Sequence, residues 1–201
     1  MITSSGDIDP GKATRVEPAI WNTLDVLNGP RHREALLVFL TLVLSHWVEH
    51  IVQAVQIFVL GWPRYQALGA LGLLFPWLVG SETLHYWYAL VTLVGLIALR
   101  PAFGGPARGW WDAAIAIQIW HHAEHALLLG QVLIGRNLFG ARVPTSVLQL
   151  FFPRVELHLA YNAAVFIPMI IAMYLHAHPS LKDRRLGSRC NCHRRLELAS
   201  G

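Results

Sequence analysis

The sequence predicts an all-α integral membrane protein, with four transmembrane helices arranged as two tandem two-helix units. The first observation is composition: 54% of the 201 residues are apolar, only 14% are charged, and the mean hydropathy is +0.42. A soluble domain would carry about 25% charged residues. The second observation is a duplicated pattern, HWVEH at 46–50 and HHAEH at 121–125, 75 positions apart. A second pair, LHYWY at 84–88 and LHLAY at 157–161, repeats at a distance of 73 positions.

Four apolar stretches are long enough to be the membrane helices. A bilayer core of roughly 30 Å requires about 20 apolar residues in a helix. The candidates lie at about 35–60, 81–99, 110–134 and 153–175. Two shorter apolar segments, 68–79 with Pro76 and 147–152, are predicted to be short interfacial or re-entrant connectors, because they are too short to span.

The helices divide the chain into five parts. These are a flexible arm (1–33), a first membrane unit (34–100), a loop (101–109), a second membrane unit (110–176) and a basic tail (177–201). Basic residues gather in the arm, the loop and the tail, which four spans place on one side of the membrane. The positive-inside rule therefore predicts a multi-pass protein of the cell membrane with cytoplasmic arm, loop, tail and termini.

The functional residues are expected inside the spans, where ionisable side chains are costly and rarely lack a partner. His46, Glu49 and His50 fall on one helix face by their i, i+3, i+4 spacing, and the second motif repeats this geometry. Glu82 and His85 share the Glu-x-x-His spacing of carboxylate-bridged di-iron bundles. The predicted metal ligands are His46, Glu49, His50, Glu82, His85, His121, His122, Glu124, His125 and His158.

Mixed imidazole and carboxylate ligands favour iron, and two octahedral ions would use about this many donors. Zinc and manganese are alternatives, and haem fits less well because of the glutamates. Glu49 and Glu124 are the expected catalytic carboxylates, whereas Tyr88, Tyr161 and Asn162 are expected to support the ligands from behind. The ligand inventory is similar in kind to the histidine boxes of membrane fatty-acid desaturases and hydroxylases, but the box spacings differ, so no family is assigned.

The expected function is oxygen-dependent oxidation of a lipid-soluble substrate by a dinuclear metal site. One alternative is a membrane carrier or sensor of metal ions or protons. Another is a membrane zinc hydrolase, because His-x-x-Glu-His is also the inverted zinc-protease motif. The expected partner is the lipid bilayer, and the sequence gives no support for nucleic-acid binding.

The tail carries the only two cysteines, in the sequence Cys190-Asn-Cys192-His193. Such a segment can hold a soft metal, or it can be a disordered basic tail beside anionic lipids, and the second interpretation is favoured. Whether Glu156 also binds metal stays open, because it does not share a helix face with His158.

Overall fold

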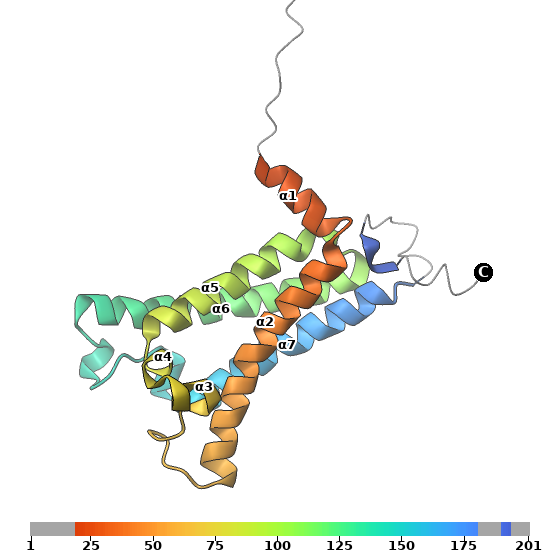
Figure 1. Cartoon of the computed structure of the whole chain (residues 1–201). Helices are drawn as coiled ribbons and strands as arrows, with labels where there is room; N and C mark the ends of the chain where they lie inside the picture. The colour runs from red at the N-terminus through yellow and green to blue at the C-terminus, as the bar shows by residue number, and fades with distance from the viewer. Residues whose placement is uncertain (1–18, 181–189, 194–201) are drawn as a thin grey trace, which may run out of the picture.

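The computed structural model describes residues 19–180 and 190–193, and all regular structure in these residues is helical (Figure 1). Four long helices correspond to the four predicted stretches, with ends within a few residues of those expected. They are α2 (His32–Ala54), extended by the π-helix η1 (Val55–Val59); α5 (Glu82–Leu99), extended by the 3₁₀ turn η2 (Arg100–Ala102); α6 (Gly105–Ile134); and α7 (Arg154–Ala177).

Three of these segments are long and apolar enough to cross a membrane: His32–Val59, Glu82–Ala102 and Arg154–Ala177. The helix α6 has 30 residues but does not reach the same hydropathy. Its interior carries Gln118, Gln131 and the HHAEH motif, whose polar side chains lower the average. The all-helical class and three candidate spans are therefore confirmed, while the fourth span and insertion into a membrane stay predictions.

Short helices form the two predicted connectors. Between α2 and α5 lie α3 (Gly69–Leu74) and α4 (Pro76–Val79), and between α6 and α7 lie the 3₁₀ turns η3 (Leu138–Gly140) and η4 (Leu148–Leu150). Apolar side chains on or near these connectors are among the most exposed of the molecule, including Trp77 (69%), Phe139 (84%) and Phe151 (74%). Large exposed apolar groups of this kind are typical of a surface that faces something other than water.

One helix lies where a flexible arm is expected. Residues Ala19–Asn28 form α1, while 1–18 lie outside the described residues. Leu27 packs against the apolar core, and the Asn28 side-chain amide donates to the carbonyl of Ala98 and accepts from the backbone N–H of Ala102. These contacts hold α1 to the end of α5, and a short-range sequence pattern does not contain them.

The long helices form a bundle around α6, which packs along both α5 and α7, while α2 crosses the other helices (Figure 1). The core of the bundle has two unlike halves. Toward the end that holds α1, the start of α2 and the end of α7, the core is apolar; its largest buried side chains include Trp111, Phe103, Leu96 and Met169. Toward the connectors, the core is made of histidines.

Candidate metal centre

Six histidines from four helices meet in the half of the bundle next to the connectors. Helix α2 contributes His46 and His50, α5 contributes His85, α6 contributes His121 and His125, and α7 contributes His158. Four of the six, His50, His121, His125 and His158, are buried, and the other two are partly buried. We call these six side chains the histidine cluster.

The rings of the cluster are in contact with one another across all four helices. In each His-x-x-Glu-His motif the two ring centroids are 4.6 Å apart, at interplanar angles of 86° in α2 and 83° in α6. His158 lies 5.2 Å from both His50 and His125. His85 lies 5.9 Å from His125 and 6.1 Å from His158. The two single histidines therefore connect the two motif pairs.

Neighbouring oxygens hold three of the rings by their Nδ1 atoms. His85 Nδ1 is 2.8 Å from the carbonyl oxygen of Ser81, and His158 Nδ1 is 2.8 Å from that of Arg154, each four residues earlier. His50 Nδ1 is 2.7 Å from Gln53 Oε1. An oxygen at this position fixes Nδ1 as the protonated nitrogen and leaves Nε2 with its lone pair free, which is the usual preparation of a metal-binding histidine.

Several buried nitrogens of the cluster have no hydrogen-bond partner. These are Nδ1 of His121, Nδ1 of His125 and Nε2 of His158. Buried polar atoms without a partner are rare in folded proteins, and each calls for an explanation such as an ion. Nε2 of His46 and Nε2 of His50 are 3.1 Å apart and share a hydrogen bond. Two nitrogens bound to one metal at about 2.1 Å lie roughly 3.0 to 3.4 Å apart, so this spacing suits a shared ion.

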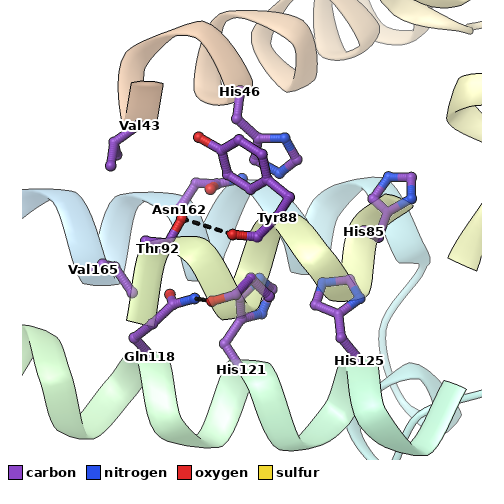
Figure 2. A pocket seen from close by; sticks show the side chains of 11 residues that line it. Val43, His46, His85, Tyr88, Thr92, Gln118, His121, His125, Asn162 and Val165 are labelled. Carbon is purple, nitrogen blue, oxygen red and sulfur yellow. Dashed lines mark hydrogen bonds between the residues drawn. The ribbon is translucent and has the colours of Figure 1, made fainter. Parts of the chain in front are cut away.

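A small cavity of about 20 Å³ adjoins the cluster. Figure 2 shows His46, His85, His121 and His125 on its walls, together with Tyr88, Thr92, Gln118 and Asn162. A space of this size holds about one water molecule. It also suits a diatomic molecule, but it is far too small for a porphyrin or a lipid chain.

The glutamate of the first motif binds backbone, not the imidazoles. Both oxygens of Glu49 accept hydrogen bonds at the start of α3, from the N–H groups of Ala70 (3.1 Å), Leu71 (2.9 Å) and Gly72 (3.2 Å). Seven residues later, the Gln56 side chain in η1 accepts from the N–H of Gly69 and donates to its carbonyl. These two side chains fasten the first connector to α2.

The glutamate of the second motif has the same kind of partners. Glu124 accepts a hydrogen bond from the N–H of Leu148 in η4 (3.0 Å) and another from the Tyr161 hydroxyl (3.0 Å). Seven residues later, the Gln131 side chain accepts from the N–H groups of Leu138 and Thr145 and donates to the Thr145 carbonyl. Gln56 and Gln131 are not among the residues expected from sequence, although their 75-residue separation repeats that of the motifs.

The remaining carboxylates near the cluster are paired with arginines. Glu82 in α5 is bound by the guanidinium of Arg154 in α7 through both nitrogens, one of them at 2.9 Å. Glu156 in α7 is paired with Arg64 at 2.6 Å. The four carboxylates considered as ligands thus all have other partners, which the sequence pattern could not indicate.

His122, also expected among the ligands, lies outside the cluster. Its ring is 4.9 Å from that of Tyr86, and it has no ring contact with the six clustered histidines. Three residues expected to support the ligands lie beside the cluster: Tyr88 stacks on His46 at 4.0 Å, Tyr161 lies 4.5 Å from His121, and Asn162 lines the cavity.

As placed, no three of the six rings bring their donor atoms within 4.8 Å of one another; within the described residues only a group at the other end of the bundle does so. A metal bound by three clustered histidines therefore requires that the rings rotate toward one another.

The chain matches no protein-family model, no curated protein and no solved structure.

Proposed function

We propose that this chain is an integral membrane metalloprotein whose histidine cluster binds two transition-metal ions and uses them for oxygen-dependent oxidation of a lipid-soluble substrate. The observation that carries the proposal is the convergence of six imidazoles from four helices, with Nδ1 of three rings anchored and three other ring nitrogens buried without a partner. Burying so many polar rings without an ion would leave their desolvation uncompensated.

Two ions suit the grouping of the rings. Each motif provides one close pair, His46 with His50 and His121 with His125, and the bridging histidines His85 and His158 can complete one set of three each. Three neutral imidazoles leave open positions on an ion, which small molecules can occupy. The 20 Å³ cavity beside the rings supports dioxygen or water as the molecule that enters.

The hydrogen bonds that the carboxylates already make limit which metal ions the cluster would bind. Imidazole suits zinc, copper, iron and nickel, whereas manganese prefers oxygen donors, and here Glu49 and Glu124 already accept backbone N–H groups. Oxygen-dependent oxidation needs a metal that changes its oxidation state, which we propose to be iron, with copper as the other candidate. Such a metal, when bound, would supply electrons to dioxygen.

The surrounding residues then have defined tasks. Glu49 and Glu124 each lie three residues after one proposed ligand and directly before the next, and their negative charge offsets that of a buried cation. Tyr88 stacks on His46 and donates its hydroxyl to the Leu42 carbonyl, which holds the ring in place. Tyr161 connects Trp120 and Glu124 through its hydroxyl group, beside His121.

The two-unit arrangement is part of the proposal. The same contacts occur in both units, and this supports the arrangement. In each unit the motif glutamate accepts a hydrogen bond from a backbone N–H of the connector that follows its helix, and so does the glutamine seven residues later. His85 and His158 are both anchored to a carbonyl four residues earlier.

The test is metal analysis of the detergent-purified protein, together with an ultraviolet-visible spectrum. We expect about two iron or copper ions per chain in the cluster and no Soret band. His50→Ala and His125→Ala should each lose most of this metal, because each removes a buried ring in contact with two other helices. His122→Ala is the matched control, because its ring lies outside the cluster, and it should keep the metal.

Oxygen consumption with lipid extracts and a reductant then tests the chemistry. Consumption that stops in His125→Ala but continues in His122→Ala would support the oxidase. Wild-type metal content in both His50→Ala and His125→Ala would overturn the site itself.

A metal carrier is the second candidate function, and the neutral donor set favours it. Six imidazoles without a carboxylate ligand contribute no negative charge, so the ion is held less firmly and can be exchanged. Metal uptake into protein-containing vesicles, without oxygen consumption, would favour the carrier. A zinc hydrolase has less support, because a general base needs an available carboxylate, whereas Glu49 accepts backbone N–H groups and Glu124 accepts from the Leu148 N–H and the Tyr161 hydroxyl.

A further inference from the structure

A short piece of the tail lies against the bundle at the end opposite to the histidine cluster. The 3₁₀ turn η5 (Asn191–His193) contacts the start of α2 and the end of α7 (Figure 1). Asn191 docks it through three groups: its N–H donates to the Gly29 carbonyl (3.2 Å), its Oδ1 accepts from the N–H of Arg33 (3.0 Å), and its Nδ2 donates to both oxygens of the Glu34 carboxylate (3.3 and 3.0 Å). The docking places Cys190 and Cys192 beside both helices.

Two histidines that the sequence analysis did not select face these cysteines. His32, at the start of α2, His176, near the end of α7, and Cys192 have donor atoms that all lie within 4.8 Å of one another. Cys190 Sγ is 3.2 Å from Nε2 of His176. Three separate segments of the chain thus bring two imidazoles and the Cys192 thiol together, with the Cys190 thiol beside His176.

His32 is prepared as a ligand in the same way as the clustered histidines. It is completely buried, and its Nδ1 is 3.0 Å from the Leu27 carbonyl. Its Nε2 is buried and has no hydrogen-bond partner. The carbonyl keeps the proton on Nδ1, so the unpartnered Nε2 presents its lone pair.

The surroundings keep water from one side of this group. The Phe103 ring lies 5.6 Å from His32 and 4.7 Å from His176, and it stacks on Trp111 at 4.1 Å. Phe103 and Trp111 are themselves almost completely buried. Donors held against an apolar wall bind a metal with less competition from solvent.

We propose that His32, His176, Cys190 and Cys192 form a four-coordinate zinc site that fastens residues 190–193 to the ends of α2 and α7. A tetrahedral set of two sulfurs and two nitrogens is typical of structural zinc. Two thiolates balance the charge of the ion, so the site adds no net charge to the apolar end of the core. The proposal is independent of the chemistry of the histidine cluster.

Cobalt substitution of the full chain in detergent tests the site, because thiolate ligands give cobalt a charge-transfer absorption that imidazoles do not. To remove the other metal, the measurement uses the His50→Ala/His125→Ala background. We expect one cobalt ion per chain with this absorption, displaced by zinc. Adding Cys190→Ser/Cys192→Ser should abolish both the absorption and the bound ion.

His178→Gln is the matched control, since His178 is exposed, lies two residues from His176, and bonds only the Tyr174 carbonyl through Nδ1. This variant should keep the absorption. Thiol alkylation gives a second measurement, because the chain has no other cysteines. Zinc should protect both thiols in the native chain, and a chelator should expose both.

Cobalt bound without charge-transfer absorption, or thiols alkylated equally with and without zinc, would overturn the proposal. Thiols that react only after a reductant is added would also overturn it, because they would show a disulfide in place of a metal site.

Discussion

Gly69 meets two requirements at once, at the point where α2 is joined to its connector. Its φ is +75°, in the left-handed region that favours glycine, and the Glu49 carboxylate occupies the place where a Cβ would stand. Gly61 has a similar φ of +70° but has nothing within 4 Å of that place. Both positions therefore require a residue that adopts a positive φ, but only position 69 also requires the absence of a side chain.

Gly69→Ala should destabilise the protein more than Gly61→Ala. Both changes incur the left-handed penalty of about 1–2 kcal/mol, but only the first displaces Glu49 from the backbone N–H groups of α3. Thermal unfolding in detergent, followed by circular dichroism, measures the difference. Equal losses in the two variants would mean that the contact with Glu49 contributes nothing.

The variant Glu49→Gln tests whether Glu49 binds the metal directly or only stabilises the connector. An amide oxygen can still accept from the N–H groups of Ala70 and Leu71 but has lost the charge, so we expect about 1 kcal/mol of lost stability. Metal retention should stay well above that of His50→Ala. Complete loss of metal in Glu49→Gln would restore the ligand role that the sequence predicts for this residue.

At the residue scale, the sequence predicts which side chains share a helix face but not which distant groups they bind. The helical periodicity placed His46, Glu49 and His50 on one face, and the structure brings both histidines into the cluster. The same periodicity cannot tell that Glu49 reaches the N–H groups of α3, because these belong to a segment about twenty residues later. His32 and His176 were not selected for the same reason, as neither belongs to a repeated histidine motif and each gains its metal-binding neighbours only in the fold.

At the scale of elements, α2 and α5 can pack closely because residue 95 of α5 is a glycine and has no side chain. Gly95 in α5 lies against the Phe39 ring of α2, and a Cβ there would be closer to the ring than real Cβ atoms approach. Phe39 is buried in the apolar core. The Phe39 ring therefore sets how closely α2 and α5 approach each other.

Gly95→Ala should lower the stability by about 1–3 kcal/mol, the usual effect of overpacking a core. The matched control is Gly130→Ala in α6, where nothing lies within 4 Å of the added Cβ. There the better helix propensity of alanine should raise stability by up to about 1 kcal/mol. Unfolding of both variants in the same detergent makes the comparison, and a stabilised Gly95→Ala would contradict the packing.

The elements themselves were predictable from sequence, because long apolar runs with sharp polar boundaries define helix ends. The ends of α5 and α7 differ by one or two residues from those expected. Helix α1 was not predicted, since its contacts through Leu27 and Asn28 are tertiary. The helix α6 begins five residues earlier than expected, at Gly105, because Pro106 is suited to a first helical turn.

At the scale of the whole molecule, ion pairs join the start of α7 to the first half of the chain. Arg154 pairs with Glu82, whose side chain is only 8% exposed, and Arg64 pairs with Glu156, whose side chain is 29% exposed. Removing one partner of a buried pair leaves an uncompensated charge, whereas exposed pairs contribute little.

Arg154→Gln should therefore destabilise the bundle by about 2–3 kcal/mol, and Arg64→Gln, its matched control, by less than about 1 kcal/mol. Adding Glu82→Gln to Arg154→Gln should restore part of the loss, because the buried charge is then removed. Denaturant titration in detergent provides the free energies of unfolding. Equal effects of the two arginine variants would show that the burial of Glu82 is unimportant.

The position of His158 in the last long helix has a consequence for the order of events during biosynthesis. His158 lies within 6 Å of His50, His121 and His125. While the ribosome is still adding α7, the first three long helices already hold five of the six rings, but the ring that lies among them is missing. Under the proposed function, both metal positions can therefore be filled only after α7 has been synthesised, because the second set of three ligands needs His158.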